Sequence, residues 1–186
     1  MPDLIETLSD MVLETSEELL REHGACLTPQ VHILAEDMDQ PYVGFISCRP
    51  FYRGADAATA LAGLGRLPSV LMATRLLVAW EDCDLRTALE LPGESFATGM
   101  VILDAGTEDH TLYWHPFDIE VGGASPHGIP TVIPHWGARA RYENVPLLAP
   151  ISALLDVWRQ FHRDDDIQQT AIELQQAGYG LNMVQR

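Results

Sequence analysis

The chain has 186 residues and no lysine, so its 11 basic side chains are all arginines, and its 27 acidic side chains give a formal net charge of −16. The missing lysine excludes P-loop and Schiff-base chemistry, and the negative charge makes nucleic acid and anionic membrane surfaces poor partners. The length and an apolar fraction of 47% fit one globular domain over residues 1–186.

The N-terminal segment, residues 1–24, predicts an acidic amphipathic helix. Its apolar residues recur at helical spacing, Asp3 is a candidate N-terminal cap, and Gly24 is a candidate C-terminal stop. We therefore expect one helix over residues 3–23.

The middle of the chain alternates short apolar runs with turn residues, a pattern typical of β-strands. A polar tip between two of these runs, at residues 104–109, predicts a β-hairpin. The predicted strands are residues 31–35, 42–48, 76–80, 100–103, 111–114 and 117–121; the predicted helices are residues 56–65, with Asp56 as the cap, and 81–91.

The last third of the chain predicts a loop region followed by two helices. Residues 122–146 hold four prolines and four glycines, which favours a loop with at most a short edge strand at residues 131–133. An apolar stripe and an acidic first turn predict C-terminal helices over residues 148–178. The order α-β-β-α-β-(α)-β-β-α-α predicts an α+β fold, with a mostly antiparallel sheet and helices packed on one face.

The cysteines and the chain start bear on location. Cys26, Cys48 and Cys83 are odd in number and far apart, so we expect free thiols and no disulfide framework. There is no cationic start typical of a secretory signal and no apolar run of membrane-spanning length. The sequence therefore predicts a cytoplasmic protein.

Histidines are concentrated in one stretch, since four of the seven fall within residues 110–135. Imidazole and carboxylate groups together suit a divalent metal with an open water position, which would make the chain a metal-dependent hydrolase. The spacing matches no known signature, and exposed histidines are the alternative. The candidate metal ligands are His115, Asp118, His127 and His135, with Glu120 as the base.

Charge is segregated along the chain. Residues 1–24 carry seven acids and one arginine, and residues 81–120 carry ten acids and one arginine. Residues 49–75 instead carry four arginines and one acid. Arg49 and Arg53, next to a predicted helix start, could bind an anion and make the chain a sensor of a small anionic ligand. Pairing of these arginines with the surplus acids is the alternative.

Acidic residues also form a stripe along the first helix. Like charges four residues apart destabilise an isolated helix by about 0.2–0.5 kcal/mol per pair, so the stripe is either a solvated face or a docking face for a basic partner. Aromatic residues in or beside predicted loops could anchor such a contact. The candidate protein-binding residues are Glu6, Asp10, Glu14, Glu17, Glu18, Phe51, Tyr52, Trp114 and Trp136.

Taken together, these patterns favour an acidic protein-interaction module without a catalytic residue or a cofactor. Adaptors, chaperones, immunity proteins and nucleic-acid mimics all belong to this class. The expected partner is a protein with a basic surface, and self-association is a second expectation. A divalent metal enters only in the hydrolase alternative.

Overall fold

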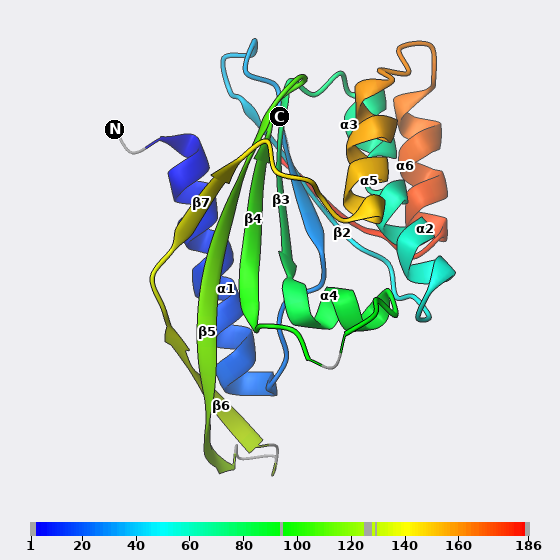
Figure 1. Cartoon of the computed structure of the whole chain (residues 1–186). Helices are drawn as coiled ribbons and strands as arrows, with labels where there is room; N and C mark the ends of the chain where they lie inside the picture. Colours follow the sequence, from blue (N-terminus) through cyan, green and yellow to red (C-terminus); the bar gives the residue numbers. More distant parts are fainter. Residues whose placement is uncertain (1–2, 94, 125–127, 129, 185–186) are drawn as a thin grey trace.

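The structure of the chain is a computed structural model that describes residues 3–93, 95–124, 128 and 130–184 (Figure 1). Its helices are α1 (Leu4–His23), α2 (Ala55–Gly63), α3 (Arg66–Val70), α4 (Asp82–Ala88), α5 (Ala149–Arg159) and α6 (Ile167–Gln176). Its strands are β1 (Gln30–Leu34), β2 (Tyr42–Ser47), β3 (Arg75–Glu81), β4 (Gly99–Ala105), β5 (His110–Ala124), β6 (Pro130–Trp136), β7 (Ala140–Glu143) and β8 (Gly180–Met183).

The described strands form one sheet in the order β6-β5-β4-β3-β1-β2-β8, and β7 pairs with β5 along the edge opposite to β4. Every pair of neighbouring strands is antiparallel. The α+β class and the antiparallel sheet are therefore confirmed. Short connections account for the pairing of β1 with β2 and of β4 with β5, because a parallel pair needs a long crossover.

The helices cover both faces of the sheet, where the sequence predicted one face. Strand β3 shows why, because its side chains alternate between two cores: Leu76, Val78 and Trp80 pack on one side, and Leu77 and Ala79 on the other. Helices α2, α3, α5 and α6 lie over the first side, and α1 is the one described helix that covers the second (Figure 1). A strand buried on both faces has no polar face, so its sequence does not reveal where each helix packs.

Helix α1 begins and ends where its sequence predicts. The Asp3 carboxylate accepts a hydrogen bond from the backbone N–H of Ile5 at 3.4 Å. At the other end Gly24 has φ +65°, and its N–H donates to the carbonyl of Leu20 at 2.9 Å. A left-handed glycine of this kind is a common helix stop.

The start of α2 differs from expectation, and α4 has a cap that the sequence did not indicate. Gly54 occupies the cap position of α2, and Asp56 lies in the first turn, where its carboxylate accepts hydrogen bonds from Arg49 and from the N–H of Tyr52. Helix α4 is capped by the buried carboxylate of Glu81, which accepts from two N–H groups of the first turn and, at 3.0 Å, from the N–H of Gly99.

Most of the predicted loop over residues 122–146 is strand. Strand β5 continues to Ala124, and β6 and β7 follow it. Pro134 is tolerated because β6 lies at the edge of the sheet, where a missing N–H breaks no ladder bond. Strand β8 was also not predicted.

Two further observations concern the described residues. None of their helices is both long enough and apolar enough to cross a membrane. Cys26, Cys48 and Cys83 all have free thiols.

Candidate functional site: a charged cleft under helix α1

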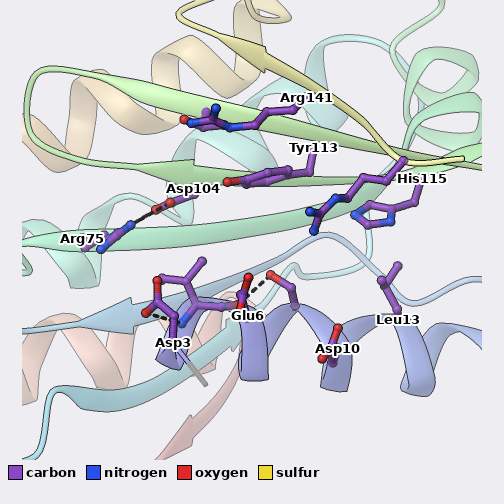
Figure 2. Close-up of a pocket in the computed structure, with 13 residues that line it drawn as sticks. Asp3, Glu6, Asp10, Leu13, Arg75, Asp104, Tyr113, His115 and Arg141 are labelled. Atoms are coloured by element: carbon purple, nitrogen blue, oxygen red, sulfur yellow. Dashed lines mark hydrogen bonds and ion pairs between the residues drawn. The ribbon is translucent and has the colours of Figure 1, made fainter. Parts of the chain in front are cut away.

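A cleft of about 500 Å³ separates the N-terminal half of α1 from the sheet (Figure 2). Its position follows from a change of residue type along one face of the strands. Under the rest of α1 that face is apolar, with Met100 and Ile102 of β4 in the core. Toward the other end of the strands it carries Arg75, Asp104 and Thr111, which line the cleft.

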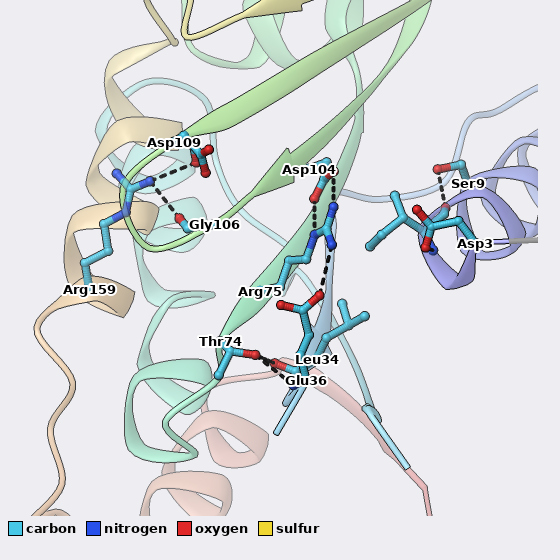
Figure 3. Close-up of polar contacts among 11 residues, drawn as sticks. Asp3, Ser9, Leu34, Glu36, Thr74, Arg75, Asp104, Gly106, Asp109 and Arg159 are labelled. Atoms are coloured by element: carbon cyan, nitrogen blue, oxygen red, sulfur yellow. Dashed lines mark hydrogen bonds and ion pairs between the residues drawn. The ribbon is translucent and has the colours of Figure 1, made fainter. Parts of the chain in front are cut away.

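Arg75 and Asp104 form a paired group at one end of the cleft (Figure 3). The Arg75 guanidinium donates from Nε and Nη2 to the two Asp104 oxygens, both at 2.7 Å, and from Nη1 to Glu36 at 2.9 Å. The Asp104 carboxylate is only 12% exposed, and these bonds raise the pKa of Arg75. Such a bidentate pair holds its geometry and has little charge left for a ligand.

Strands β5 and β7 supply the second part of the wall. Tyr113 lies opposite Arg141 in the register of these two strands, so both side chains emerge on the face that carries α1. Arg139 precedes β7 and places its guanidinium 5.2 Å from the centre of the Tyr113 ring. Among the described residues Arg139 has no ion-pair partner.

His115 lies on the same face of β5 and is half-buried. Burial lowers its pKa, the charge of Arg139 lowers it further, and the charge of Asp10 acts in the opposite direction. The imidazole is therefore neutral at pH 7 and can accept one hydrogen bond and donate another. Within the described part of the chain it has no hydrogen-bond partner, so both nitrogens are free for a ligand or water.

The opposite wall is α1. Glu6 and Asp10 line the cleft, are exposed, and have no ion-pair partner in the described ranges (Figure 2). The Ser9 hydroxyl between them donates to the carbonyl of Ile5 at 2.7 Å. Ser9 is thus occupied within the helix and is not paired with His115 as an activated nucleophile would be. The cleft is suited to holding charged groups of both signs.

The predicted metal ligands do not come together. His115 lies in the cleft. Asp118 and His135 lie opposite each other in the register of β5 and β6 and line a separate hollow. The His135 side chain contacts Glu120, with 2.9 Å between Nε2 and the carboxylate. His127 lies outside the described residues. Within the described ranges no three metal-binding side chains gather in one place.

The two arginines of the predicted anion site are also separated from each other. Arg49 donates to Asp56 through both terminal nitrogens and to the carbonyl of Pro50 at 2.9 Å. This contact holds the pKa of Asp56 below its usual range. Arg53 is exposed and lines a different hollow. Arg49 is therefore paired internally, which was the alternative considered from the sequence.

The candidate protein-binding aromatics are mostly part of the core. Phe51 and Trp114 pack against the core under α5, and Trp136 packs against the core under α1. The indole N–H of Trp136 donates to Glu17 at 2.9 Å, so Glu17 turns toward the sheet. Only Tyr52, at 86%, is largely exposed among these four aromatic residues.

Sequence reasoning missed the cationic wall. Arg139 and Arg141 belong to a group of four arginines over residues 139–163 to which no role was assigned from the sequence, although the Arg-Ala-Arg spacing places both side chains on one face of an extended segment. That alternation was a usable signal. The prediction of a loop over residues 122–146 hid it.

Comparison with protein-family models, with curated proteins and with solved structures finds no match to this chain.

Proposed function

We propose that the chain is a non-catalytic interaction module whose helix α1 docks onto a partner protein with a basic surface. The observation that carries the proposal is the state of the acidic stripe, defined as Glu6, Asp10, Glu14 and Glu18. All four side chains are exposed, and none has an ion-pair partner within the described part of the chain.

The arginines support the same proposal, because most of them are already engaged. Each of these guanidinium groups contacts a carboxylate of the same chain, so it is not available to neutralise the remaining acids. The arginines in such pairs are Arg21, Arg49, Arg66, Arg75, Arg86 and Arg141.

An unpaired acidic face attracts a basic surface over several ångströms and speeds association at low salt. Adaptors, chaperones, immunity proteins and nucleic-acid mimics share this property, and the proposal covers that class. Tyr52 lies just before α2, on the other side of the sheet from α1, and therefore is not part of the docking face. We also propose a cytoplasmic location, where the three free thiols stay reduced.

The test is capture of a partner from a cell lysate at low and at high ionic strength, with wild-type protein and the double variant Glu14→Gln/Glu18→Gln. Wild-type protein should retain a partner at low salt and release it at high salt. The variant should retain little of it. Both positions are exposed, and the variant removes repulsion between charges four residues apart, so its fold is preserved.

The matched control is Asp164→Asn/Asp165→Asn, which removes the same charge from exposed positions before α6. This variant should capture the partner as wild-type protein does. Equal loss in both variants would mean that net charge alone is responsible, and a partner insensitive to salt would contradict docking through α1.

The hydrolase alternative keeps its own test. It requires His115, Asp118 and His135 to act with His127, yet the three described residues lie in two places. Elemental analysis of protein purified without an affinity tag should find no stoichiometric zinc, iron or manganese. A bound metal that is lost in His127→Ala would favour the hydrolase instead.

A further inference from the structure

We propose that the cleft between α1 and the wall of β5 and β7 binds a small zwitterion of the short-peptide class. Its carboxylate would lie between Arg139 and Arg141, and its ammonium group would lie against Glu6 and Asp10. This site goes beyond the docking function. It shares Glu6 and Asp10 with the acidic stripe, but the docking test changes Glu14 and Glu18, which do not line the cleft, so the two proposals are tested separately.

The cationic wall has capacity for a carboxylate. Arg139 has no ion-pair partner in the described ranges, and its guanidinium is placed by the Tyr113 ring. Among the residues that the structure describes, Arg141 pairs only with Glu143, and both side chains are more than half exposed, at 57% and 63%. An exposed pair of this kind is weak and gives way to a better partner. Guanidinium groups bind carboxylates through two parallel hydrogen bonds.

The acidic wall selects against a simple anion. Glu6 and Asp10 face the same space and are not neutralised by any described side chain. A ligand with only negative charge would be repelled by them, and one with only positive charge would be repelled by Arg139 and Arg141. A ligand with one charge of each sign is complementary to both walls.

The size and remaining lining of the cleft fit a short peptide. A volume of about 500 Å³ lies within the range of small-molecule sites. Leu13 and Tyr113 offer apolar surface between the charged walls. The neutral imidazole of His115, which no described side chain contacts through a hydrogen bond, can bond a peptide amide. Arg75 and Asp104 neutralise each other and close one end.

The experiment uses three probes that share the glycylglycine backbone and carry different charges. Glycylglycine has both charges, N-acetylglycylglycine has only the carboxylate, and glycylglycine amide has only the ammonium group. Isothermal titration calorimetry with the full chain should show glycylglycine binding in the millimolar range or tighter. Each derivative should bind about tenfold more weakly, because it leaves one charged wall without a partner.

Two variants locate the binding. Arg139→Gln and Asp10→Asn are both at exposed positions, and each should weaken glycylglycine binding about tenfold. Arg163→Gln is the control, because Arg163 is exposed and lies outside the cleft. It should bind glycylglycine as the wild-type chain does.

Three results would overturn the proposal. They are no detectable binding of glycylglycine, equal binding of the three probes, and unchanged binding in Arg139→Gln. None of these results bears on docking through Glu14 and Glu18, so the two proposals fail separately.

Discussion

A buried histidine on β1 shows how single residues set the response of this chain to pH. His32 is 3% exposed, and its ring is stacked on Phe45 with 5.2 Å between ring centres. Its Nδ1 lies 3.0 Å from the hydroxyl of Tyr42, and its Nε2 lies 3.1 Å from the amide nitrogen of Gln30. An amide nitrogen only donates, so this arrangement assigns the proton to Nδ1 and favours the neutral ring.

We expect protonation of His32 to destabilise the fold. Burial lowers its pKa from 6.5 to about 4, so between these values the unfolded chain binds a proton that the folded chain does not. The free energy of unfolding should fall as the pH falls through this window, by roughly 3 kcal/mol in total, because one pKa unit corresponds to about 1.4 kcal/mol. Urea unfolding between pH 7 and pH 4 measures the slope.

Other groups titrate in the same window, so the comparison between variants isolates His32. His32→Asn keeps a donor near Tyr42 but no longer titrates, and its unfolding free energy should depend less on pH between 6.5 and 5. His23→Gln, at an exposed position, should keep the wild-type slope. Equal slopes in all three proteins would show that His32 does not carry the effect.

At the scale of one strand, Gly99 allows Trp114 to lie flat on β4. A β-carbon at Gly99 would come within 2.5 Å of the Trp114 indole. The indole ring is rigid, so the whole side chain would have to move. Trp114 in turn packs against the core under α5. The contact therefore joins β4, β5 and the helical layer.

Gly99→Ala should lower the free energy of unfolding by about 1–3 kcal/mol, the usual cost of overpacking. Chemical denaturation followed by tryptophan fluorescence measures it. The matched control is Gly123→Ala in β5, where an added β-carbon meets nothing within 4 Å. A similar loss in both variants would attribute the effect to the glycine backbone rather than to Trp114.

For the whole molecule, the dominant feature is unbalanced charge. A formal charge of −16 on 186 residues repels itself, and the folded state brings those charges closer together than the unfolded chain does. The internal arginine pairs offset this only in part. The described carboxylates outside those pairs include the whole acidic stripe of α1.

The midpoint of thermal unfolding should therefore rise when sodium chloride is added from about 10 mM to a few hundred millimolar, because the Debye length falls from about 30 Å to under 10 Å. Circular dichroism measures the midpoint. Glu14→Gln/Glu18→Gln should show a smaller rise than the wild-type chain. A midpoint that falls with salt would mean that the attractive arginine pairs outweigh the repulsion.

The local pattern of residues was enough to determine much of the fold. Helix α1 was predicted from Asp3 to Gly24 because both of its ends are set by hydrogen bonds within one turn of the chain. The strands from β1 to β5 follow from short apolar runs, and short connections make β1 antiparallel to β2 and β4 antiparallel to β5. The pairing of Arg49 with a nearby acid was likewise foreseen as one of two outcomes.

What the sequence alone determined is thus local: the charge, the missing lysine, most elements and the antiparallel class. Tertiary structure decided which face each helix covers, that Glu17 turns toward Trp136, and that Arg139 and Asp10 face one cleft from positions far apart in the chain. The reason is physical. Alternation tells which residues share a face, but the partner of that face depends on packing between distant segments, which local spacing does not encode.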